Sequence, residues 1–163
     1  MVRIARSSSV LLLTVAGFLS VSGTAAADEG RYNYVTLGDA WSAAEGIACG
    51  GRVYGGAVYS ETIQPGPGAD RVDHRGWVLF SVGAAFVGLS AAPGVHCSAA
   101  ATISWRNLDT GAAGSWTSDV NGSLPPFLGT GASTEIFTGS GRVEARLTTN
   151  RPHLPSVTGF TVF

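Results

Sequence analysis

The feature that most restricts the possible folds is a strict alternation of apolar and polar side chains over residues 142–148. Val143, Ala145 and Leu147 occupy the odd positions, and charged or polar residues occupy the even ones. Successive side chains of a β-strand point to opposite faces, so this period predicts a strand over 142–149 with one face on a core. Residues 159–163 are also rich in β-formers, and prolines between the two segments interrupt pairing. We expect two strands joined by a short loop.

Further strands are expected upstream of this pair. Residues 102–106 and 115–120 flank a cluster of small turn residues at 109–114, which predicts a β-hairpin. Residues 134–138 are typical of one more strand, and the glycines at 139–141 predict a tight turn after it.

The apolar run at 77–89 fits a buried strand, a pair of strands or a core helix, although its glycines and branched residues favour a strand. The segment Asp39 to Glu45 is the one stretch that could form a short helix. Weaker strand candidates and loops rich in proline and glycine complete the pattern: strands at 32–37 and 53–59, and loops at 65–68 and 122–130.

About seven to nine short strands separated by glycine- and proline-rich turns predict an all-β sandwich or barrel. We favour an immunoglobulin-like two-sheet β-sandwich with one disulfide. Two distant cysteines with a tryptophan between them suit a bridge between sheets that an aromatic ring covers. The chain has this order as Cys49, Trp77 and Cys97. The resemblance to immunoglobulin domains is one of architecture only.

The first 27 residues have the three parts of a secretory signal peptide. A basic stretch at 1–6 precedes an apolar stretch at 10–21 that is too short to span a membrane, and small residues at 24–27 resemble a cleavage site. Cleavage there would start the mature protein at Asp28 and leave a single domain at 28–163. We therefore expect a secreted protein, extracellular or in the cell envelope, without stable membrane insertion.

The expected export predicts that the two cysteines are bonded to each other, because paired thiols in an oxidising compartment normally form a disulfide. A catalytic thiol is the alternative, since His96 precedes Cys97. Neighbouring side chains of a strand point to opposite faces, however, which argues against a Cys–His contact. A bridge from Cys49 to Cys97 would close a loop of about 49 residues and stabilise the fold by roughly 4 kcal/mol in the chain-entropy model.

The charged residues exclude a nucleic-acid-binding surface. Without the two arginines of the signal segment, the mature chain has eight arginines against 11 acidic residues. The arginines are dispersed, whereas a phosphate-binding surface needs a concentrated basic stripe. The chain has no lysine and much glycine and alanine, a bias that indicates a GC-rich genome such as that of an actinobacterium.

A block of ten residues, 34–43, resembles the first motif of the SGNH (GDSL-type) secreted esterases, in which a buried strand leads into Gly-Asp-Ser. The nucleophile of that family would fall on Ala40, which has no hydroxyl and cannot form an acyl-enzyme. The later motifs of the family are missing, and no aspartate stands three positions before His153. We expect that the protein is not an enzyme.

The densest group of possible metal ligands is Asp70, Asp73 and His74. Two carboxylates and an imidazole could bind a metal ion, and Asp73 and His74 would be the first candidates for an enzymatic cleft. Arg71 and Arg75 alternate with the acids and can pair with them, which is typical of a solvated loop. We expect neither a metal nor a cofactor.

Exposed tryptophan and tyrosine on a sheet face often contact sugars or proteins, whereas buried ones only fill the core. Trp105 lies two residues after Ile103 and so faces the same side of the strand, and we therefore expect it to be buried. Trp116 alternates with small polar residues and is our candidate for a ligand contact. The other large aromatics weighed for this role are Trp41, Tyr54, Tyr59 and Trp77.

Residues 105–111 and 133–163 resemble small secreted actinobacterial β-sandwich proteins of unknown function, a resemblance that implies no mechanism. We predict a monomeric binding or cell-envelope module whose ligand is an unknown protein or glycan. A subunit of a ring-shaped outer-envelope pore is one alternative, although short segments interrupted by glycine do not suit the long amphipathic strands that a pore needs. A hydrolase related to the SGNH esterases is the other.

Overall fold

The computed structural model describes residues 32–89, 97–122 and 131–163, and within them it contains strands and turns but no helix. The strands in chain order are β1 (Asn33–Ala43), β2 (Ile47–Tyr59), β3 (Thr62–Ile63), β4 (Val72–Asp73), β5 (Trp77–Leu89), β6 (Cys97–Asn107), β7 (Ala113–Gly122), β8 (Ala132–Phe137), β9 (Gly141–Thr149), β10 (His153–Leu154) and β11 (Ser156–Val162).

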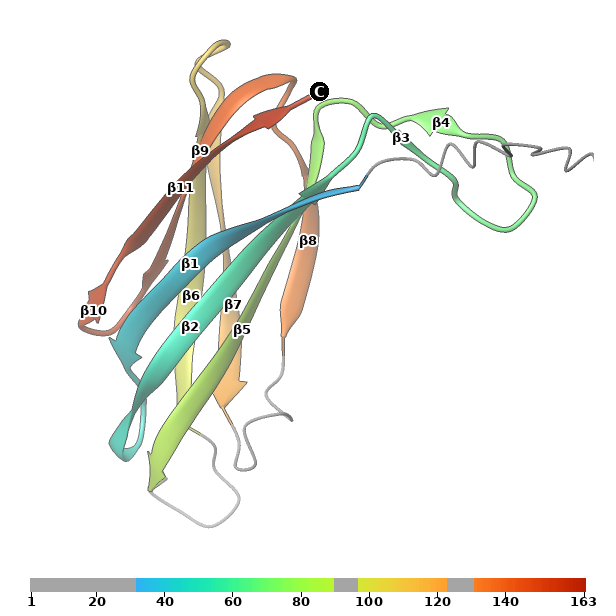
Figure 1. Ribbon diagram of the computed structural model, residues 1–163. Helices are drawn as coiled ribbons and strands as arrows, with labels where there is room; N and C mark the ends of the chain where they lie inside the picture. The colour runs from blue at the N-terminus through green and yellow to red at the C-terminus, as the bar shows by residue number, and fades with distance from the viewer. Residues whose placement is uncertain (1–31, 90–96, 123–130) are drawn as a thin grey trace, which may run out of the picture.

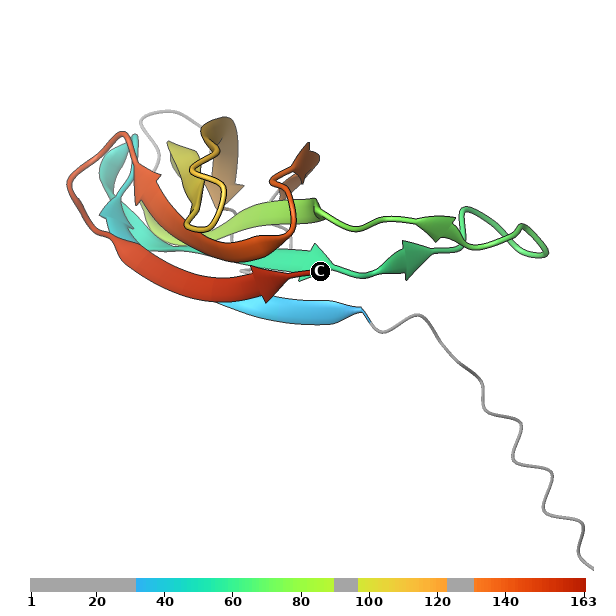
Figure 2. The same ribbon diagram turned by 90° about the horizontal axis from the view of Figure 1, so that it is seen from above.

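The strands form two antiparallel sheets that lie face to face (Figure 1). The five-stranded sheet has the order β10-β1-β2-β5-β8, and the four-stranded sheet has the order β11-β9-β6-β7. The short strands β3 and β4 pair with each other and form a ribbon that projects from one end of the sandwich (Figure 2). The prediction of an all-β, two-sheet fold is confirmed.

The core between the sheets comes from strict alternation along the strands. Every odd-numbered residue of β6, from Cys97 to Asn107, is buried, and none of the even-numbered ones is. Val143, Ala145 and Leu147 of β9 are buried in the same way, as their period in the sequence predicts. Phe80 of the opposite sheet is fully buried against this layer. Burial of a side chain the size of valine or phenylalanine contributes about 1.5–3 kcal/mol.

The strands predicted near the C-terminus are confirmed. Residues 142–149 lie in β9 and most of residues 159–163 lie in β11, and these two strands pair with Ala145 opposite Thr158. The predicted hairpin is formed by β6 and β7, with Ile103 opposite Trp116.

The apolar run at Trp77–Leu89 is one continuous strand, β5, which pairs with β2 on one side and β8 on the other. The strand predicted at 134–138 is β8. Because β8 belongs to the five-stranded sheet and β9 to the four-stranded sheet, the turn at 139–141 carries the chain from one layer to the other.

The short helix expected from Asp39 to Glu45 is wrong. Asp39–Ala43 form the end of β1, which pairs with β2 along one side. At Trp41 and Ser42 the strand also pairs with β10 on its other side. Alanine is the best helix former, but helix propensity is a weak local preference, and cross-strand pairing to two neighbours outweighs it here.

The disulfide prediction is confirmed, because Cys49 of β2 is bonded to Cys97 of β6 and the bridge joins the two sheets. Trp77, however, does not cover the bridge. The disulfide lies beside Gly88, 11 residues further along β5, which is about 36 Å of extended strand away. The expected order of cysteine, tryptophan and cysteine therefore has no structural meaning here.

The immunoglobulin-like strand order finds no support. In an immunoglobulin domain the second and third strands belong to different sheets. Here the second and third long strands, β2 and β5, are neighbours in one sheet, and the ribbon of β3 and β4 lies between them in the chain.

The segments predicted to direct export, 1–27, lie outside the described residues, as do His96 and most of the loop expected at 122–130. The disulfide is compatible with an extracellular location, because such bonds persist in oxidising compartments. Within the described ranges, no helix is long and apolar enough to cross a membrane.

Candidate functional site

A β-bulge shapes the outward face of β1. The pairing of β1 with β2 shifts between Thr36 and Asp39, and Gly38 between them has a φ of 78°. This left-handed conformation costs glycine little, and it adds one residue to the strand. With strict period two, Tyr34 and Trp41 would face opposite sides. Because of the extra residue both face solvent on the same side, with exposed fractions of 63% and 59%.

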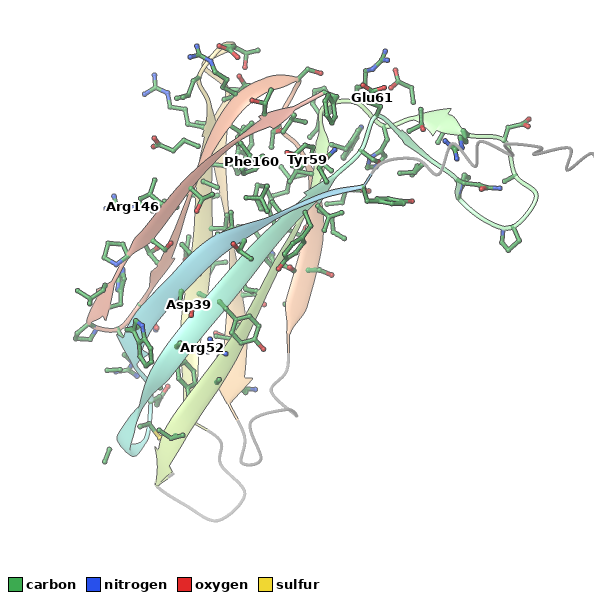
Figure 3. The ribbon with its side chains drawn as sticks, viewed as in Figure 1. Asp39, Arg52, Tyr59, Glu61, Arg146 and Phe160 are labelled. Atoms are coloured by element: carbon green, nitrogen blue, oxygen red, sulfur yellow. A yellow bond between two sulfur atoms is a disulfide. The ribbon has the colours of Figure 1, made fainter. Side chains whose placement is uncertain are left out.

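Strand β2 adds two further side chains to this surface. Arg52 lies opposite Trp41, and Tyr54 lies opposite Asp39. Directly opposite residues of an antiparallel pair have Cβ atoms about 5 Å apart on the same face. Figure 3 shows Asp39 and Arg52 on neighbouring strands of the five-stranded sheet. We call the outward surface formed by Tyr34, Asp39, Trp41, Arg52 and Tyr54 the aromatic face.

Two tyrosine rings of the aromatic face lie across the sheet, above glycines. A Cβ atom on Gly83 of β5 would stand 2.7 Å from the ring of Tyr54. A Cβ atom on Gly56 of β2 would stand 2.8 Å from the ring of Tyr34. Since glycine has no side chain, each ring can approach the backbone while part of it stays exposed to solvent. The glycines therefore allow the rings to lie low on this surface.

The polar groups of the aromatic face form an ion pair. Nη1 of Arg52 lies 3.2 Å from Oδ2 of Asp39, and the two side chains are 51% and 39% exposed. The guanidinium of Arg52 also lies 5.8 Å from the ring centroid of Tyr54, within reach of a cation–π interaction. Two planar charged groups are thus held between the aromatic rings, with part of each still open to solvent.

The outward face of the four-stranded sheet has a different character. Thr102 and Thr117 share a hydrogen bond of 2.8 Å between their hydroxyls on neighbouring strands. Arginine and glutamate side chains line a shallow depression of about 290 Å³ on β6 and β9, formed by Ser104, Trp105, Arg106, Glu144 and Arg146. Arg146 is labelled in Figure 3, away from the Asp39–Arg52 pair. The molecule therefore presents one aromatic and one polar face.

The two tryptophans singled out on β6 and β7 both contribute to the core. Trp105 is buried, as expected. Trp116, the predicted ligand contact, is half-buried and packs against the core opposite Ile103. Trp41 is the most exposed of the four tryptophans, at 59%. To choose Trp41 as the ligand contact from the sequence, one would have to recognise that Gly38 forms a bulge. The bulge changes the face on which the later residues of β1 lie.

The structure separates the possible metal ligands near the ribbon. Nε2 of His74 lies 2.8 Å from Oε1 of Glu135 on β8, and only 11% of the His74 side chain is exposed. Asp73 is exposed, and its Oδ1 accepts a hydrogen bond from the backbone N–H of Arg75. In the part of the chain that the structure describes, no group of three or more side chains could hold a metal ion. His74 instead fixes the base of the ribbon to the sandwich.

Aromatic rings also close the end of the sandwich beside the ribbon. Tyr59 stacks on Phe160 at a centroid distance of 5.4 Å, and both lie between the sheets (Figure 3). Burial raises the pKa of Tyr59 above its ordinary value, so its hydroxyl stays protonated. Trp77 packs edge-on against Phe137 at 5.4 Å, and both rings are partly exposed. Tyr59 and Phe160 fill the core and offer no reactive group.

In the structure, the block at 34–43 that resembles the SGNH esterases does not form an esterase site. Ala40, at the position of the family's serine, is fully buried in the core opposite Val53. A hydroxyl at this position would point between the sheets and would be closed to a substrate. Nδ1 of His153 donates a hydrogen bond to the backbone oxygen of Arg151, at 2.7 Å.

These features define a disulfide-bridged, two-sheet β-sandwich with an exposed aromatic face on its five-stranded sheet. Comparison with known proteins finds no matching family model, no similar curated protein and no similar solved structure. Its function must therefore be inferred from its own residues.

Proposed function

We propose that this protein is a secreted binding module that contacts its ligand through the aromatic face. The observation that carries the proposal is the placement of Tyr34, Trp41 and Tyr54 on one exposed side of the sheet, at 63%, 59% and 41% exposure. A folded monomer rarely leaves such rings clustered in water without a use, because their burial against a partner is favourable.

Two further observations support this class of function over catalysis. Asp73 and His74, the first candidates for an enzymatic cleft, have separate structural partners. The bond between Cys49 and Cys97 suits a protein that must persist outside the cytoplasm, where the signal-like segment 1–27 would direct it. We therefore assign the protein to binding in the extracellular space or the cell envelope.

Adsorption to isolated cell envelopes of the producing organism tests the proposal. The double variant Trp41→Ala/Tyr54→Ala removes two rings of the aromatic face and is expected to bind at least about tenfold more weakly, the effect of losing a central aromatic contact. The matched control is Leu108→Ala/Val157→Ala, which removes two side chains that are 49% and 53% exposed elsewhere on the surface. Equal adsorption of both double variants would contradict the proposal.

A further inference from the structure

We infer that the ligand of the aromatic face is an uncharged polysaccharide whose sugar rings stack on Tyr34, Trp41 and Tyr54. This inference rests on the proposed function, since it names the ligand class for the same surface. It depends on three properties of that surface: the closeness of the rings to the sheet, their spread along it and the balance of charge between them.

The position of the rings close to the sheet favours sugars over a protein partner. Tyr54 reaches over Gly83 and Tyr34 reaches over Gly56, so both rings lie close to the sheet instead of projecting away from it. A pyranose has an apolar C–H side that fits flat against such a ring. Protein hot spots instead bury aromatic or arginine side chains in well-packed pockets. Exposed rings that lie close to the sheet form a low surface, which suits an extended ligand that packs along it.

The spread of the rings indicates a chain of sugars rather than a single one. Tyr34 lies opposite Val58 of β2, whereas Trp41 lies opposite Arg52 of the same strand. Six residues of extended strand separate these two positions, which is about 20 Å. Tyr54 lies between them along β2. Rings distributed over this length can engage several consecutive units of a polymer.

The charges between the rings favour a neutral ligand. Asp39 and Arg52 are paired at 3.2 Å, so their charges cancel on the surface. A phosphate or carboxylate bound at Arg52 would be repelled by Asp39. A sugar hydroxyl suits both groups, since it can donate a hydrogen bond to the carboxylate and accept one from the guanidinium.

The floor of the aromatic face leaves room for such a chain. Gly56 pairs with Ser81, and Ser81 pairs with Ser133 on β8. Gly83 and Ala85 continue this row of small residues along β5. The rings cover Gly56 and Gly83, and the small side chains of Ser81, Ser133 and Ala85 leave the sheet low beside them, so a polymer can pass there while remaining in contact with the rings.

Affinity electrophoresis of the purified, oxidised protein tests the inference. The gels contain an uncharged glucan, mannan, galactan or arabinan, and parallel gels contain the anionic polymer polygalacturonate. Binding to surfaces coated with casein or albumin is measured separately as a probe for protein ligands. We expect at least one of the neutral polymers to retard the protein, and polygalacturonate and the protein-coated surfaces to have no effect.

The variants connect retardation to the rings and the ion pair. Trp41→Ala and Tyr54→Ala are each expected to weaken binding about tenfold, whereas Trp41→Phe and Tyr54→Phe retain a ring and most of the affinity. Asp39→Asn/Arg52→Gln keeps the surface neutral but changes its hydrogen bonding, and a threefold or larger loss, roughly, is expected. Val157→Ala, on the outer side of β11, is the control and should bind as the wild type does. Urea unfolding verifies that each variant is folded.

Four outcomes separate this inference from the proposed function. Retardation by a neutral polymer that depends on the rings supports both. Retardation by none of the neutral polymers, or only by polygalacturonate, overturns the inference. Ring-dependent binding to casein or albumin, without retardation in neutral gels, overturns the inference while the aromatic face remains a binding surface. Neutral-polymer binding that survives the loss of Trp41 and Tyr54 overturns both.

Discussion

At the residue scale, Asn107 connects two turns at one end of the core. The residue is fully buried at the end of β6. Its Nδ2 lies within 3.0–3.2 Å of the backbone oxygens of Thr138, Gly139 and Ser140, which form the crossing between the sheets. Its Oδ1 accepts hydrogen bonds from the backbone N–H groups of residues 109 and 110, in the turn after β6, at 3.0 and 3.1 Å. One side chain thus satisfies backbone groups from two separate turns.

We predict that Asn107→Ala destabilises the fold by about 3 kcal/mol, because buried carbonyls and N–H groups would lose their partner. Asn107→Asp should be at least as harmful, since a carboxylate cannot donate to the three carbonyls and is repelled by them. Urea unfolding measures both effects. Asn121→Ala, at a half-buried position of β7, is the control and should change stability by less than about 1 kcal/mol. A similarly small change at Asn107 would show that the turns do not need its amide.

Asp109 and Arg142 form a second connection between the same turns. The carboxylate accepts hydrogen bonds from the backbone N–H of Arg142 at 2.7 Å and from its guanidinium at 2.9 and 2.7 Å. The side-chain hydrogen bonds from Arg142 lower the pKa of Asp109 from its ordinary value of 3.8, and the backbone hydrogen bond lowers it further. The ionised form is therefore favoured in the folded state.

This shift predicts the direction of one pH effect. Since the pKa of Asp109 is lower in the folded state, the pair stabilises the protein above pH 3.8 and loses its contribution as the pH falls through the lowered value. Thermal unfolding between pH 2 and 6 should therefore show that stability falls less steeply toward acid pH in Asp109→Asn than in the wild type. The number of protons taken up on unfolding should differ between the two by about 1 at most. Asp70→Asn, in the ribbon loop, is the control. An unchanged slope in Asp109→Asn would refute the coupling.

At the element scale, glycine allows β2, β5 and β7 to come together at the disulfide end. A Cβ atom on Gly51 of β2 would stand 2.2 Å from the backbone oxygen of Ala85. A Cβ atom on Gly122 of β7 would stand 2.5 Å from the backbone nitrogen of Phe86. In both positions the obstacle is backbone, which cannot rotate away as a side chain can. These glycines therefore fix how closely the strands approach.

We expect Gly51→Ala to destabilise the protein by about 3 kcal/mol, because β2 or β5 must move to admit the methyl group. The matched control is Gly66→Ala in the ribbon loop, where a Cβ atom would have nothing within 4 Å. That substitution should be neutral or slightly stabilising, within about 1 kcal/mol, through its effect on the unfolded chain. Chemical unfolding of both variants provides the comparison, and equal stabilities would argue against a steric requirement at Gly51.

At the scale of the whole molecule, the Cys49–Cys97 bond is a covalent connection between the two sheets. The two residues are 48 positions apart in the chain. A bridge over such a loop restricts the unfolded ensemble strongly, and both cysteines are buried at the end where glycines bring the strands close.

We predict that Cys49→Ser/Cys97→Ser loses roughly 4 kcal/mol of stability, the value expected from loop closure. Reduction of the wild type should shift its urea midpoint to the same extent, while the double variant should not respond to reductant. Ser98→Ala, beside the bridge on the outward side of β6, is the control. If the wild type unfolds at the same urea concentration with and without reductant, the bridge does not contribute in this way.

Much of the fold could be predicted from the sequence because its signals are local. The alternation in β9 depends only on which residues face the core, and the turn cluster before β7 depends only on small residues in a row. The disulfide followed from two cysteines and their expected compartment. Periodicity also fixed Trp105 as a buried residue.

The candidate site could not be predicted, because the bulge at Gly38 changes which side chains share a face. A period of two carries no mark of where a residue is inserted, so Trp41 looked no more exposed than Trp116. The arrangement of Tyr54 over Gly83 depends on the pairing of β2 with β5, which no local pattern specifies. The sequence alone thus determined most of the extended segments, although not the end of β1, and which sulfurs bond. Only the tertiary structure decided which surface carries the rings, since faces are set by strand partners and register.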